Sequence, residues 1–378
     1  MGSNINNFID SKKDDILTTL GTLVNLDSAT FYKKGVDIAG DFLSQKFLET
    51  GFDIERIPQK DYGDHLLCKF KGQGDNTLII GHFDTALPQG CPKLRPFKII
   101  GNKGYGCGVA DMKAGVIATL YAIKSILETT ELRPNITVIL NSDEEPGSPT
   151  SRDVIFQEAP KAARAFIMEP GEHHSIITHR KGVGIFTFFT KGIAAHAGAE
   201  PEKGRSAIIE MGHMILDLSR LNDFERGITV NVGVISGGTY PYVVAEEASA
   251  KVDCRIPTKK DGEYLKEKFD EIIGNSKIKG VKRSWQGDFH RPPMEKVENT
   301  DQLLQIINNI AEELAIPIKE SSTGGASDGN LTSSRNIITI DGMGPSGSGF
   351  HGPDEYVEIN SVFERTKLLA QTLNSIYK

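Results

Sequence analysis

A short apolar run meets a histidine and an acid in Leu78-Ile79-Ile80-Gly81-His82-Phe83-Asp84, and this segment sets our first expectation for the architecture. Apolar runs followed by acids recur further along the chain, in Ile139-Leu140-Asn141-Ser142-Asp143-Glu144-Glu145 and in Ile167-Met168-Glu169. Short apolar runs of this kind are typical of buried strands. The carboxyl ends of parallel strands lie at one edge of an α/β sheet, where ligands bind. We therefore expect the polar ends of these segments to converge at that edge.

Helical and strand patterns alternate around these segments. Ile16, Leu20 and Leu23 fall on one face of a helix, and a second helical pattern ends near Gly51. Strands that alternate with helices indicate a mainly parallel α/β sheet with helices on both faces. The expected elements are helices over 16–24, 36–50 and 114–127 and strands over 77–80, 136–140 and 165–168.

The pattern changes near His179, where apolar residues begin to alternate strictly with small or polar ones, as at Val183 and Ile185 and at Val230, Val232 and Val234. Strict alternation predicts an antiparallel sheet with one face covered by helices. After Arg291 the alternation of helix and strand returns. We therefore expect a smaller α+β domain, 180–290, inserted into a catalytic domain formed by 1–179 and 291–378. The elements expected here are strands over 183–189, 228–234, 248–254 and 337–340 and helices over 208–218, 262–273 and 303–314, followed by a C-terminal helix.

Length, charge and cysteine usage exclude several classes of protein. A chain of 378 residues exceeds the usual size of one hydrophobic core, which predicts more than one domain. The net charge of −7 argues against a nucleic-acid partner, and the sequence has no apolar run typical of a membrane span or a secretory signal. The 4 cysteines form no Cys-x-x-Cys pair, so we expect reduced thiols and a cytoplasmic protein.

Acids and histidines gathered at one sheet edge suit a metal centre. Carboxylates that lie together repel unless they are protonated or bind a cation, and imidazole with carboxylate is a ligand set for zinc. Each motif alone has a plainer interpretation. A His-x-Asp is more often a hydrogen-bonded histidine, an Asp-Glu-Glu is usually a solvated turn, and Glu169 alone would be a loop acid. The set in this order is far more specific than any member.

These segments resemble the zinc-dependent family of glutamate carboxypeptidases, aminoacylases, acetylornithine deacetylases and succinyl-diaminopimelate desuccinylases. The resemblance covers nearly the whole chain, from His82 to Phe350-His351-Gly352-Pro353-Asp354-Glu355-Tyr356. Within the family the chain is most similar to bacterial folate-cleaving glutamate carboxypeptidases, in Asp143-Glu144-Glu145-Pro146-Gly147-Ser148 and in Ala195-His196-Ala197-Gly198-Ala199-Glu200-Pro201. The resemblance implies that the inserted domain is a lid and that it joins two chains in a homodimer.

The resemblance also implies two zinc ions per chain, which cobalt or manganese can replace. Asp111 would bridge the ions, because a carboxylate has two oxygens that can hold neighbouring cations. A cis peptide bond would follow Asp111. His82 and Glu169 would complete one ion, and Glu145 and His351 the other.

Catalytic roles follow from the same resemblance. Asp84 would accept a hydrogen bond from His82 and fix the orientation of that ring. Glu144 would be the general base, which takes a proton from the water between the metals and passes it to the leaving amine. An isolated histidine such as His196 is more often structural. Its surrounding motif implies that it stabilises the oxyanion, often from the partner subunit.

Substrate-binding residues are expected at two arginines and a glycine-rich loop. Arg291 and Arg255 resemble arginines that contact the substrate carboxylate or the opposite subunit in relatives. Guanidinium suits this work because it pairs with a carboxylate through two parallel hydrogen bonds. The loop Thr323-Gly324-Gly325-Ala326-Ser327-Asp328 would add donors near Gly325 and Asp328, or form a plain glycine turn.

The leading hypothesis is a dinuclear zinc hydrolase that cleaves an amide bond of a small or short-peptide substrate with a free carboxylate. Carboxypeptidase-type release of glutamate or a similar residue is favoured. An N-acyl amino acid deacylase of the acetylornithine deacetylase or aminoacylase type would use the same ligands and stays open. A catalytically silent homologue that binds amino-acid derivatives is the alternative of another class, and the retained Glu144 argues against it. Many family members have Asn-x-x-Pro where this chain has Tyr242-Val243-Val244-Ala245, which weakens any inferred specificity.

Overall fold

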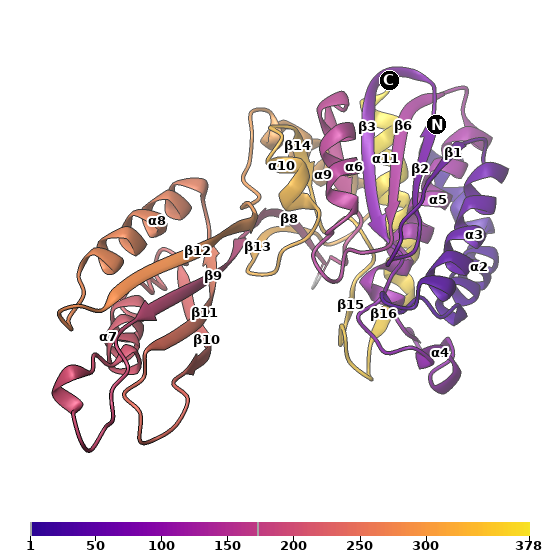
Figure 1. Ribbon diagram of the computed structural model, residues 1–378. Helices are drawn as coiled ribbons and strands as arrows, with labels where there is room; N and C mark the ends of the chain where they lie inside the picture. The colour runs from indigo at the N-terminus through magenta and orange to yellow at the C-terminus, as the bar shows by residue number, and fades with distance from the viewer. Residues whose placement is uncertain (1, 172–173) are drawn as a thin grey trace. The chain divides into compact units, whose positions relative to one another are not determined.

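The computed structural model describes residues 2–171 and 174–378, which form two compact units. Unit 1 comprises Met1–Thr178, Lys296–Ser322 and Ser327–Lys378, and unit 2 comprises His179–Glu295 and Thr323–Ala326. In Figure 1 the first part of unit 1 runs from indigo to magenta, and its last part runs from orange to yellow. Within the described ranges, no helix has both the length and the apolar character needed to cross a membrane.

Unit 1 is built on a six-stranded sheet in the order β1-β2-β6-β3-β7-β14. The strands β6, β3, β7 and β14 run parallel, whereas β1 and β2 form an antiparallel edge. Ile80 of β3 lies in register with Ile139 of β6 and Ile167 of β7, so these strands end close to the same level. The predicted mainly parallel sheet is confirmed. Its strands are β1 (Asp53–Ile57), β2 (His65–Phe70), β3 (Gln73–His82), β6 (Pro134–Asn141), β7 (Arg164–Ile167) and β14 (Ile338–Ile340).

Helices cover both faces of this sheet, as predicted. Ile79 and Phe166 belong to the larger core cluster, which includes residues of α1, α2, α3, α5, α9 and α11. Ile80 and Ile167 face the other way, into a cluster with residues of α6 and α10. Successive side chains of a strand point to opposite faces, so strands covered on both sides are continuously apolar. The helices are α1 (Gly2–Ser11), α2 (Lys13–Asn25), α3 (Lys33–Glu49), α5 (Ala114–Thr129), α6 (Ser151–Glu158), α9 (Thr300–Glu313), α10 (Gly329–Ser333) and α11 (Ile359–Ile376).

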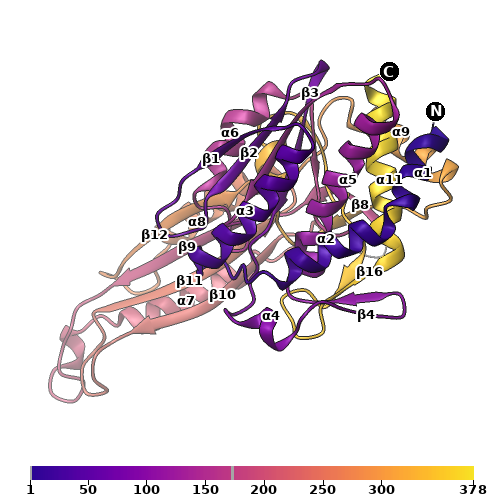
Figure 2. The ribbon, with the colours of Figure 1, turned by 90° about the vertical axis from the view of Figure 1, so that its right-hand side faces the viewer.

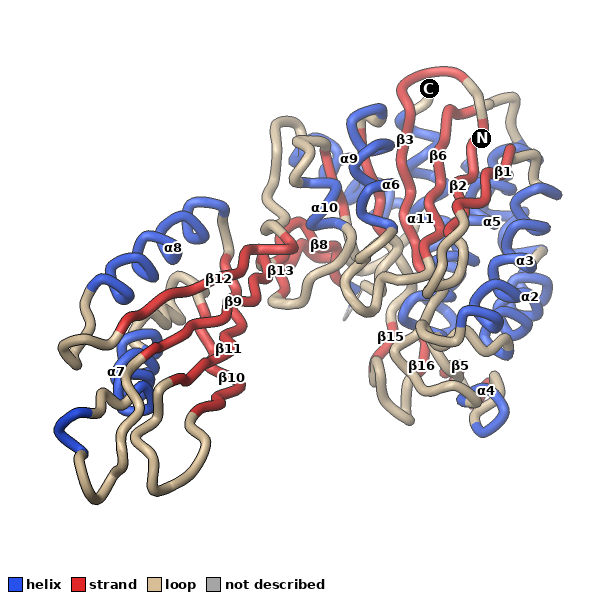
Figure 3. The backbone as a smooth tube through the Cα atoms, in the orientation of Figure 1, coloured by secondary structure: helices blue, strands red, loops and turns tan. Residues whose placement is uncertain are grey.

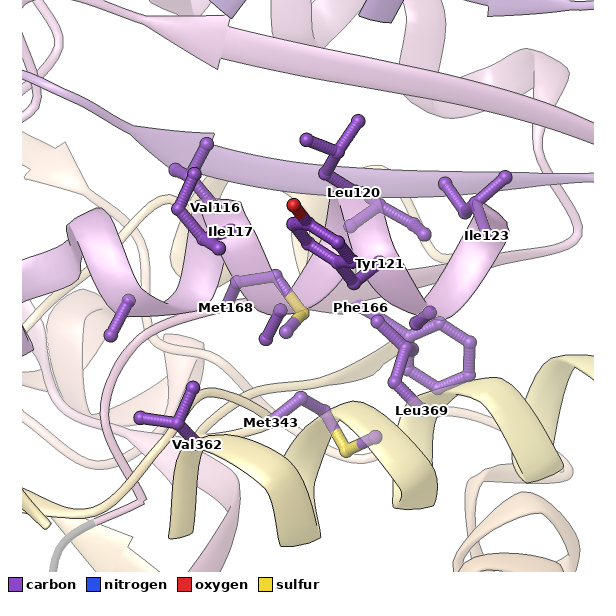
Figure 4. Packing of buried hydrophobic residues seen from close by; sticks show 14 of the residues in the cluster. Val116, Ile117, Leu120, Tyr121, Ile123, Phe166, Met168, Met343, Val362 and Leu369 are labelled. Carbon is purple, nitrogen blue, oxygen red and sulfur yellow. The ribbon is translucent and has the colours of Figure 1, made fainter. Parts of the chain in front are cut away.

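The helix α5 lies at the centre of unit 1. It is buried almost all round, and an unbroken apolar sequence is what such a position requires. Val116 and Leu120 of α5 lie in one cluster with Val362 and Leu369 of α11 (Figure 4). Figure 2 shows α1, α5 and α11 side by side. The short segment η1 (Val109–Lys113) carries Asp111 in a non-helical backbone conformation and runs directly into the buried helix α5.

Short strands form a second, four-stranded sheet in unit 1, in the order β15-β16-β5-β4. The loop between β15 and β16 carries His351. Tyr356 of β16 pairs with Tyr105 of β5, which ties the end of the chain to the segment before η1. The strands are β4 (Lys98–Ile100), β5 (Lys103–Tyr105), β15 (Gly347–Ser348) and β16 (Tyr356–Glu358). A separate two-stranded sheet pairs β8 (Ser175–Arg180) with β13 (Lys319–Thr323).

The cysteines differ from the expectation of reduced thiols. Cys91, in the short helix α4 (Cys91–Leu94), and Cys107 form a disulfide, with their Cα atoms 6.3 Å apart. Cys68 and Cys254 are free and buried. The expectation is therefore wrong for Cys91 and Cys107. Their pairing depends on the return of the chain through β4 and β5, which no local pattern announced.

Unit 2 is a four-stranded antiparallel sheet in the order β10-β11-β9-β12, with α7 and α8 packed on one face (Figure 3). The predicted alternation holds in β11, where Ala250, Val252 and Cys254 are buried. The elements are β9 (Gly182–Lys191), α7 (Ala207–Ser219), β10 (Thr229–Gly237), β11 (Glu247–Ile256), α8 (Lys259–Gly274) and β12 (Lys282–Arg291).

In two strands of unit 2, the side chains that face the core are not the ones expected from the sequence. In β9 the core residues are Phe186 and Phe188, whereas Ile185, from the expected series, is 45% exposed. The pairing of Phe188 with Ala250 places the aromatic series on the covered face. In β10 the register shifts after Val232, and Val234 is 57% exposed. The bulge interrupts the alternation, and residues 233–237 of β10 are all exposed.

Candidate metal centre

The structure brings the predicted ligands of unit 1 together at the carboxyl ends of its parallel strands. His82 is the last residue of β3, and the loops after β6 and β7 carry Glu144, Glu145 and Glu169. Because β3 lies between β6 and β7, these segments are neighbours at one sheet edge. Ligand atoms within 4.8 Å of one another come from two overlapping groups: His82, Asp111 and Glu145, and His82, Glu144 and Glu169.

The carboxylate of Asp111 lies between two histidines. Its Oδ1 is 3.1 Å from Nε2 of His82, and its Oδ2 is 3.2 Å from Nε2 of His351. Nε2 of His82 is also 3.8 Å from Oε1 of Glu169, and Nε2 of His351 is 3.1 Å from Oε2 of Glu145. Each histidine thus has its own glutamate and shares Asp111 with the other. This arrangement is suited to two neighbouring cations that share one carboxylate.

Asp84 lies behind His82 and is fully buried. Nδ1 of His82 is 3.3 Å from Oδ1 of Asp84 and 3.1 Å from its backbone oxygen, so both ring nitrogens face acceptors. Thr30 donates to Oδ2 of Asp84 at 2.8 Å, and the backbone N–H of Glu144 donates to Oδ1 at 3.2 Å. Asp84 therefore connects the orientation of His82 to the loop of Glu144 and Glu145. No sequence pattern marked Thr30 as a site residue.

A second buried carboxylate, that of Glu355, holds the backbone of Asp111. It accepts hydrogen bonds from the N–H groups of Gly108, Ala110 and Asp111, at 2.8, 2.9 and 3.1 Å. Burial raises the pKa of Glu355 to about 7 although these hydrogen bonds oppose the change. The peptide bond after Asp111 is cis, as the resemblance implies. Glu355 was missed as a site residue, and its only signal in the sequence was its place near His351 in an already distinctive segment.

The electrostatics of the centre fit divalent cations. Burial and the nearby Asp111 raise the pKa of Glu169 well above its ordinary value. Burial alone would lower the pKa of His82, but hydrogen bonds to Asp111 and Asp84 raise it well above the usual range. Hydrogen bonds to Asp111 and Glu145 raise the pKa of His351 to about 10. The crowded carboxylates favour positive charge between them, and cations bound to imidazole and carboxylate would supply it.

His196 and Arg255 belong to unit 2. Nδ1 of the exposed His196 accepts hydrogen bonds from the backbone N–H groups of Gly198 and Ala199, both at 3.1 Å. In the neutral ring the proton is therefore on Nε2, which can act as a donor. Arg255 pairs with Asp253 of the same strand through Nε and Nη2, at 2.8 and 3.1 Å.

The remaining predicted substrate residues have different surroundings. Arg291 ends β12 in unit 2 and is 4% exposed. Gly325 also belongs to unit 2, where its carbonyl oxygen is 3.3 Å from Nη1 of Arg180. Asp328 is buried in unit 1, where it accepts hydrogen bonds from Asn141 at 2.6 Å and from Ser148 at 2.5 Å. These contacts join Asp328 to both ends of the Glu144–Glu145 loop and give its carboxylate a structural part.

Two known enzymes are similar to this chain over most of its length. Carboxypeptidase G2 of Pseudomonas sp. (strain RS-16) is 28% identical over 367 residues, which cover 95% of this chain and 88% of that protein. A succinyl-diaminopimelate desuccinylase of Nitrosospira multiformis is 25% identical, with 96% of this chain and 98% of that protein covered.

Solved structures share the fold. Aminopeptidase PepT from Bacillus cereus superposes with a TM-score of 0.81 at 21% identity, covering 97% of this chain and 99% of that one. The YXEP protein of Bacillus subtilis, described as a dinuclear metal binding peptidase, gives a TM-score of 0.74 at 14% identity, covering 97% of this chain and 99% of that one. Residues 78–375 match the description "Peptidase family M20/M25/M40". The chain belongs to this family of metallopeptidases and is a hydrolase.

Proposed function

We propose that the protein is a dinuclear zinc carboxypeptidase, which hydrolyses the amide bond before a C-terminal glutamate or a similar residue. The observation that carries this proposal is the position of Asp111, whose two carboxylate oxygens face His82 and His351 separately. Glu169 and Glu145 would complete the two cation positions. Similarity to carboxypeptidase G2 supports the choice of a carboxypeptidase.

Cations held by these residues would supply a more acidic water and a Lewis acid for the carbonyl of the scissile amide. Glu144 would accept a proton from that water as its oxygen attacks the carbonyl carbon. The same carboxyl group would then return the proton to the amide nitrogen, so that the C–N bond breaks and a neutral amine leaves. Asp84 would keep His82 oriented through the contact at Nδ1.

His196 would donate a hydrogen bond from Nε2 to the oxyanion that forms when water adds to the carbonyl. The two backbone hydrogen bonds at Nδ1 support this role, because they favour the tautomer with a proton on Nε2. Arg291 would bind the α-carboxylate of the residue that is released. A guanidinium matches a carboxylate through two parallel hydrogen bonds.

A homodimer formed through unit 2 is part of the proposal. The strand β10 is at the edge of its sheet, and Val234 and Ile235 on it are 57% and 56% exposed. Ile209 of α7 is 58% exposed. Edge strands with exposed apolar side chains favour pairing with another chain, and a two-fold axis would bring identical edges together.

A deacylase of N-acyl amino acids is the second candidate. The succinyl-diaminopimelate desuccinylase relative favours it, because that enzyme removes an acyl group from an amino acid rather than a residue from a peptide. Both candidates would use the same cation ligands. The substrate panel described next separates them.

The test is a comparison of dipeptides that end in glutamate, N-acyl-glutamates and N-acetylornithine, using protein loaded with zinc. Amino-acid analysis would measure what is released, before and after chelation. We expect about two ions per chain and preferred release of glutamate from the dipeptides. Preferred cleavage of N-acetylornithine would favour the deacylase. Protein without bound metal at zinc saturation would contradict the proposal as a whole.

A further inference from the structure

The Glu144–Glu145 loop of unit 1 is contacted by a buried histidine from a neighbouring strand. His65 is the first residue of β2, and it is 0% exposed. Because β2 pairs antiparallel with β6, the beginning of β2 lies beside the end of β6, where the loop starts. The loop ends at α6, which begins at Ser151. The sheet therefore fixes His65 at the same edge as the candidate metal centre.

Both ring nitrogens of His65 bond to this loop, one at each end of it. The backbone N–H of Ser142 lies 3.3 Å from Nδ1, and the hydroxyl oxygen of Ser142 lies 3.0 Å from the same nitrogen. Nε2 lies 2.9 Å from the hydroxyl oxygen of Thr150. The ring thus connects the residue where the loop starts to the residue that precedes α6.

These partners determine which nitrogen of His65 carries the proton. The hydroxyl of Thr150 donates to the carboxylate of Asp143 at 2.7 Å, so its oxygen is left to accept a hydrogen bond from Nε2. The N–H of Ser142 needs an acceptor, which Nδ1 without a proton provides. A neutral ring with its proton on Nε2 satisfies both ends of the loop.

Burial favours this neutral ring. It lowers the pKa of His65 below its ordinary value. An opposing effect comes from four carboxylates, those of Asp143, Asp84, Asp328 and Asp64. A proton on Nδ1 would face the N–H of Ser142 and break the hydrogen bond at that end. The contact is therefore specific to a neutral imidazole.

The backbone of the loop forms a tight turn between these two ends. The N–H of Gly147 donates to the carbonyl of Glu144 at 2.7 Å, and the N–H of Ser148 donates to the carbonyl of Asp143 at 2.8 Å. The carboxylate of Asp143 also accepts from the N–H of Thr150 at 2.7 Å. A shift of either end against β2 would therefore move the backbone that carries the side chain of Glu144.

Glu145 has a second set of contacts, which does not involve His65. Its backbone N–H donates to Oδ2 of Asp84 at 3.4 Å, and its Oε1 accepts from the backbone N–H of Ala86 at 2.8 Å. Both partners lie in the segment after β3. Loss of the His65 contacts should therefore disturb the proposed general base more than the neighbouring metal ligand.

We propose that His65 is a positioning residue for the general base, which holds the carboxylate of Glu144 in place by closing the Glu144–Glu145 loop at both ends. The inference rests on the proposed function and adds a residue that acts on the reaction only through Glu144. A displacement of about 1 Å in a catalytic group can cost about a hundredfold in rate. The plainer interpretation, that His65 only satisfies polar groups in the core, predicts a loss of stability without a specific loss of kcat.

The experiment compares two variants of the zinc-loaded full chain on the substrate of the panel above that the wild type cleaves best. His65→Phe keeps a buried ring but removes both hydrogen bonds, so kcat should fall about thirty- to a hundredfold, with KM changed less than about twofold. His65→Asn keeps an acceptor for the N–H of Ser142 and should lose only about three- to tenfold in kcat.

Zinc affinity, measured by competition with a chelator, separates positioning of the base from positioning of the metal ligands. Loss of support for a ligand typically costs about ten- to a hundredfold in metal affinity. We expect a change of less than about threefold in both His65 variants, because Glu145 keeps its contacts with Asp84 and Ala86. A loss of affinity as large as the loss of kcat would overturn the inference.

Tyr121→Phe is the matched control for stability. It removes another buried hydrogen bond of unit 1, the 3.0 Å contact between the hydroxyl of Tyr121 and Thr19 of α2. Tyr121→Phe and His65→Phe should both lower Tm, but only His65→Phe should lower kcat. An equal loss of kcat in the control would reduce His65 to a structural residue.

An unchanged kcat in a folded His65→Phe protein would overturn the inference and leave the proposed function intact. If His65→Phe did not fold, His65→Asn would decide, and an unchanged kcat in that variant would have the same meaning. A wild type that hydrolyses none of the substrates would overturn the proposed function, and the inference with it.

Discussion

The two units of the molecule assemble their candidate functional residues differently. In unit 1, His82, Asp111 and His351 come from distant parts of the chain. Nε2 of His82 and Nε2 of His351 nevertheless lie 3.1 and 3.2 Å from the carboxylate oxygens of Asp111, which is hydrogen-bond distance. In unit 2, the side chains of His196 and Arg255 make their hydrogen bonds with residues close by in sequence. Unit 1 therefore contains all the ligands that we propose for the cations. The groups that we propose for unit 2 would act only on a bound substrate, which predicts that metal binding and turnover can be separated by mutation.

The largest effect should come from the shared ligand of unit 1. Asp111→Asn removes the charge that both cation positions depend on, so it should abolish binding of both ions. Turnover should fall below about one ten-thousandth of the wild-type value. Arg255→Ala in unit 2 is the control and should retain both ions. Elemental analysis and glutamate release would measure the two effects, and an Asp111→Asn protein with two tightly bound ions would contradict the bridging role.

Substitutions of the neighbouring Glu144 and Glu145 should separate the role of general base from that of metal ligand. Glu144→Gln should keep both ions and lose about two to four orders of magnitude in kcat, because a positioned base is removed. Glu145→Gln should weaken metal binding, because this carboxylate faces His351. Titration with zinc followed by kinetics at saturation would distinguish the variants. Equal loss of metal in both would mean that the assigned roles are wrong.

Much of unit 1 could be predicted because its signals are local. The apolar run of α5 and the strands before His82 and Glu169 were all expected, and the structure has them. The helix α1 and the short strands β4, β5, β15 and β16 were not expected. Strands of so few residues have no periodicity to detect, and their pairing joins 103–105 to 356–358. The disulfide between Cys91 and Cys107 depends on the hairpin of β4 and β5, which is built from these short strands.

The candidate site shows the same limit. Metal ligands at strand ends could be proposed from sequence, because parallel strands that end in polar residues converge by geometry. Thr30 and Glu355 could not, because their partners, Asp84 and the backbone near Asp111, are far away in the chain. Asp328 was expected near the substrate on the strength of its glycine-rich loop. Its burial against Asn141 and Ser148 depends on tertiary contacts, which the composition of the loop does not reveal.

Arg291 provides the next effect in size, and it tests whether unit 2 recognises the carboxylate. A partly desolvated, two-pronged contact is worth about 2–4 kcal/mol, so Arg291→Ala should lower kcat/KM about thirty- to a thousandfold on substrates with a free carboxylate. Arg291→Lys should recover only part of this loss, because an ammonium cannot form the paired hydrogen bonds. Both variants should keep their metal ions.

A substrate with the carboxylate capped as an amide is the control for Arg291. The wild type should process it poorly, whereas Arg291→Ala should be nearly indifferent to the cap. Equal cleavage of capped and free substrates by the wild type would instead make Arg291 a structural residue of unit 2, in keeping with its burial.

The smallest change in activity should come from a test of whether His196 acts on the active site of its own chain or on that of the partner subunit. If His196 acts on the site of the partner subunit, an inactive His196→Ala protein mixed with an inactive Glu144→Gln protein should regain about a quarter of full activity. Random exchange makes half of the dimers mixed. In each mixed dimer one site has Glu144 from one chain and His196 from the other, and the second site lacks both. Activity after exchange would be measured against each variant alone. If His196 served the site of its own chain, every site in the mixture would lack one group and no activity would return, whereas a fully active monomer in light scattering would remove the dimer from the proposal.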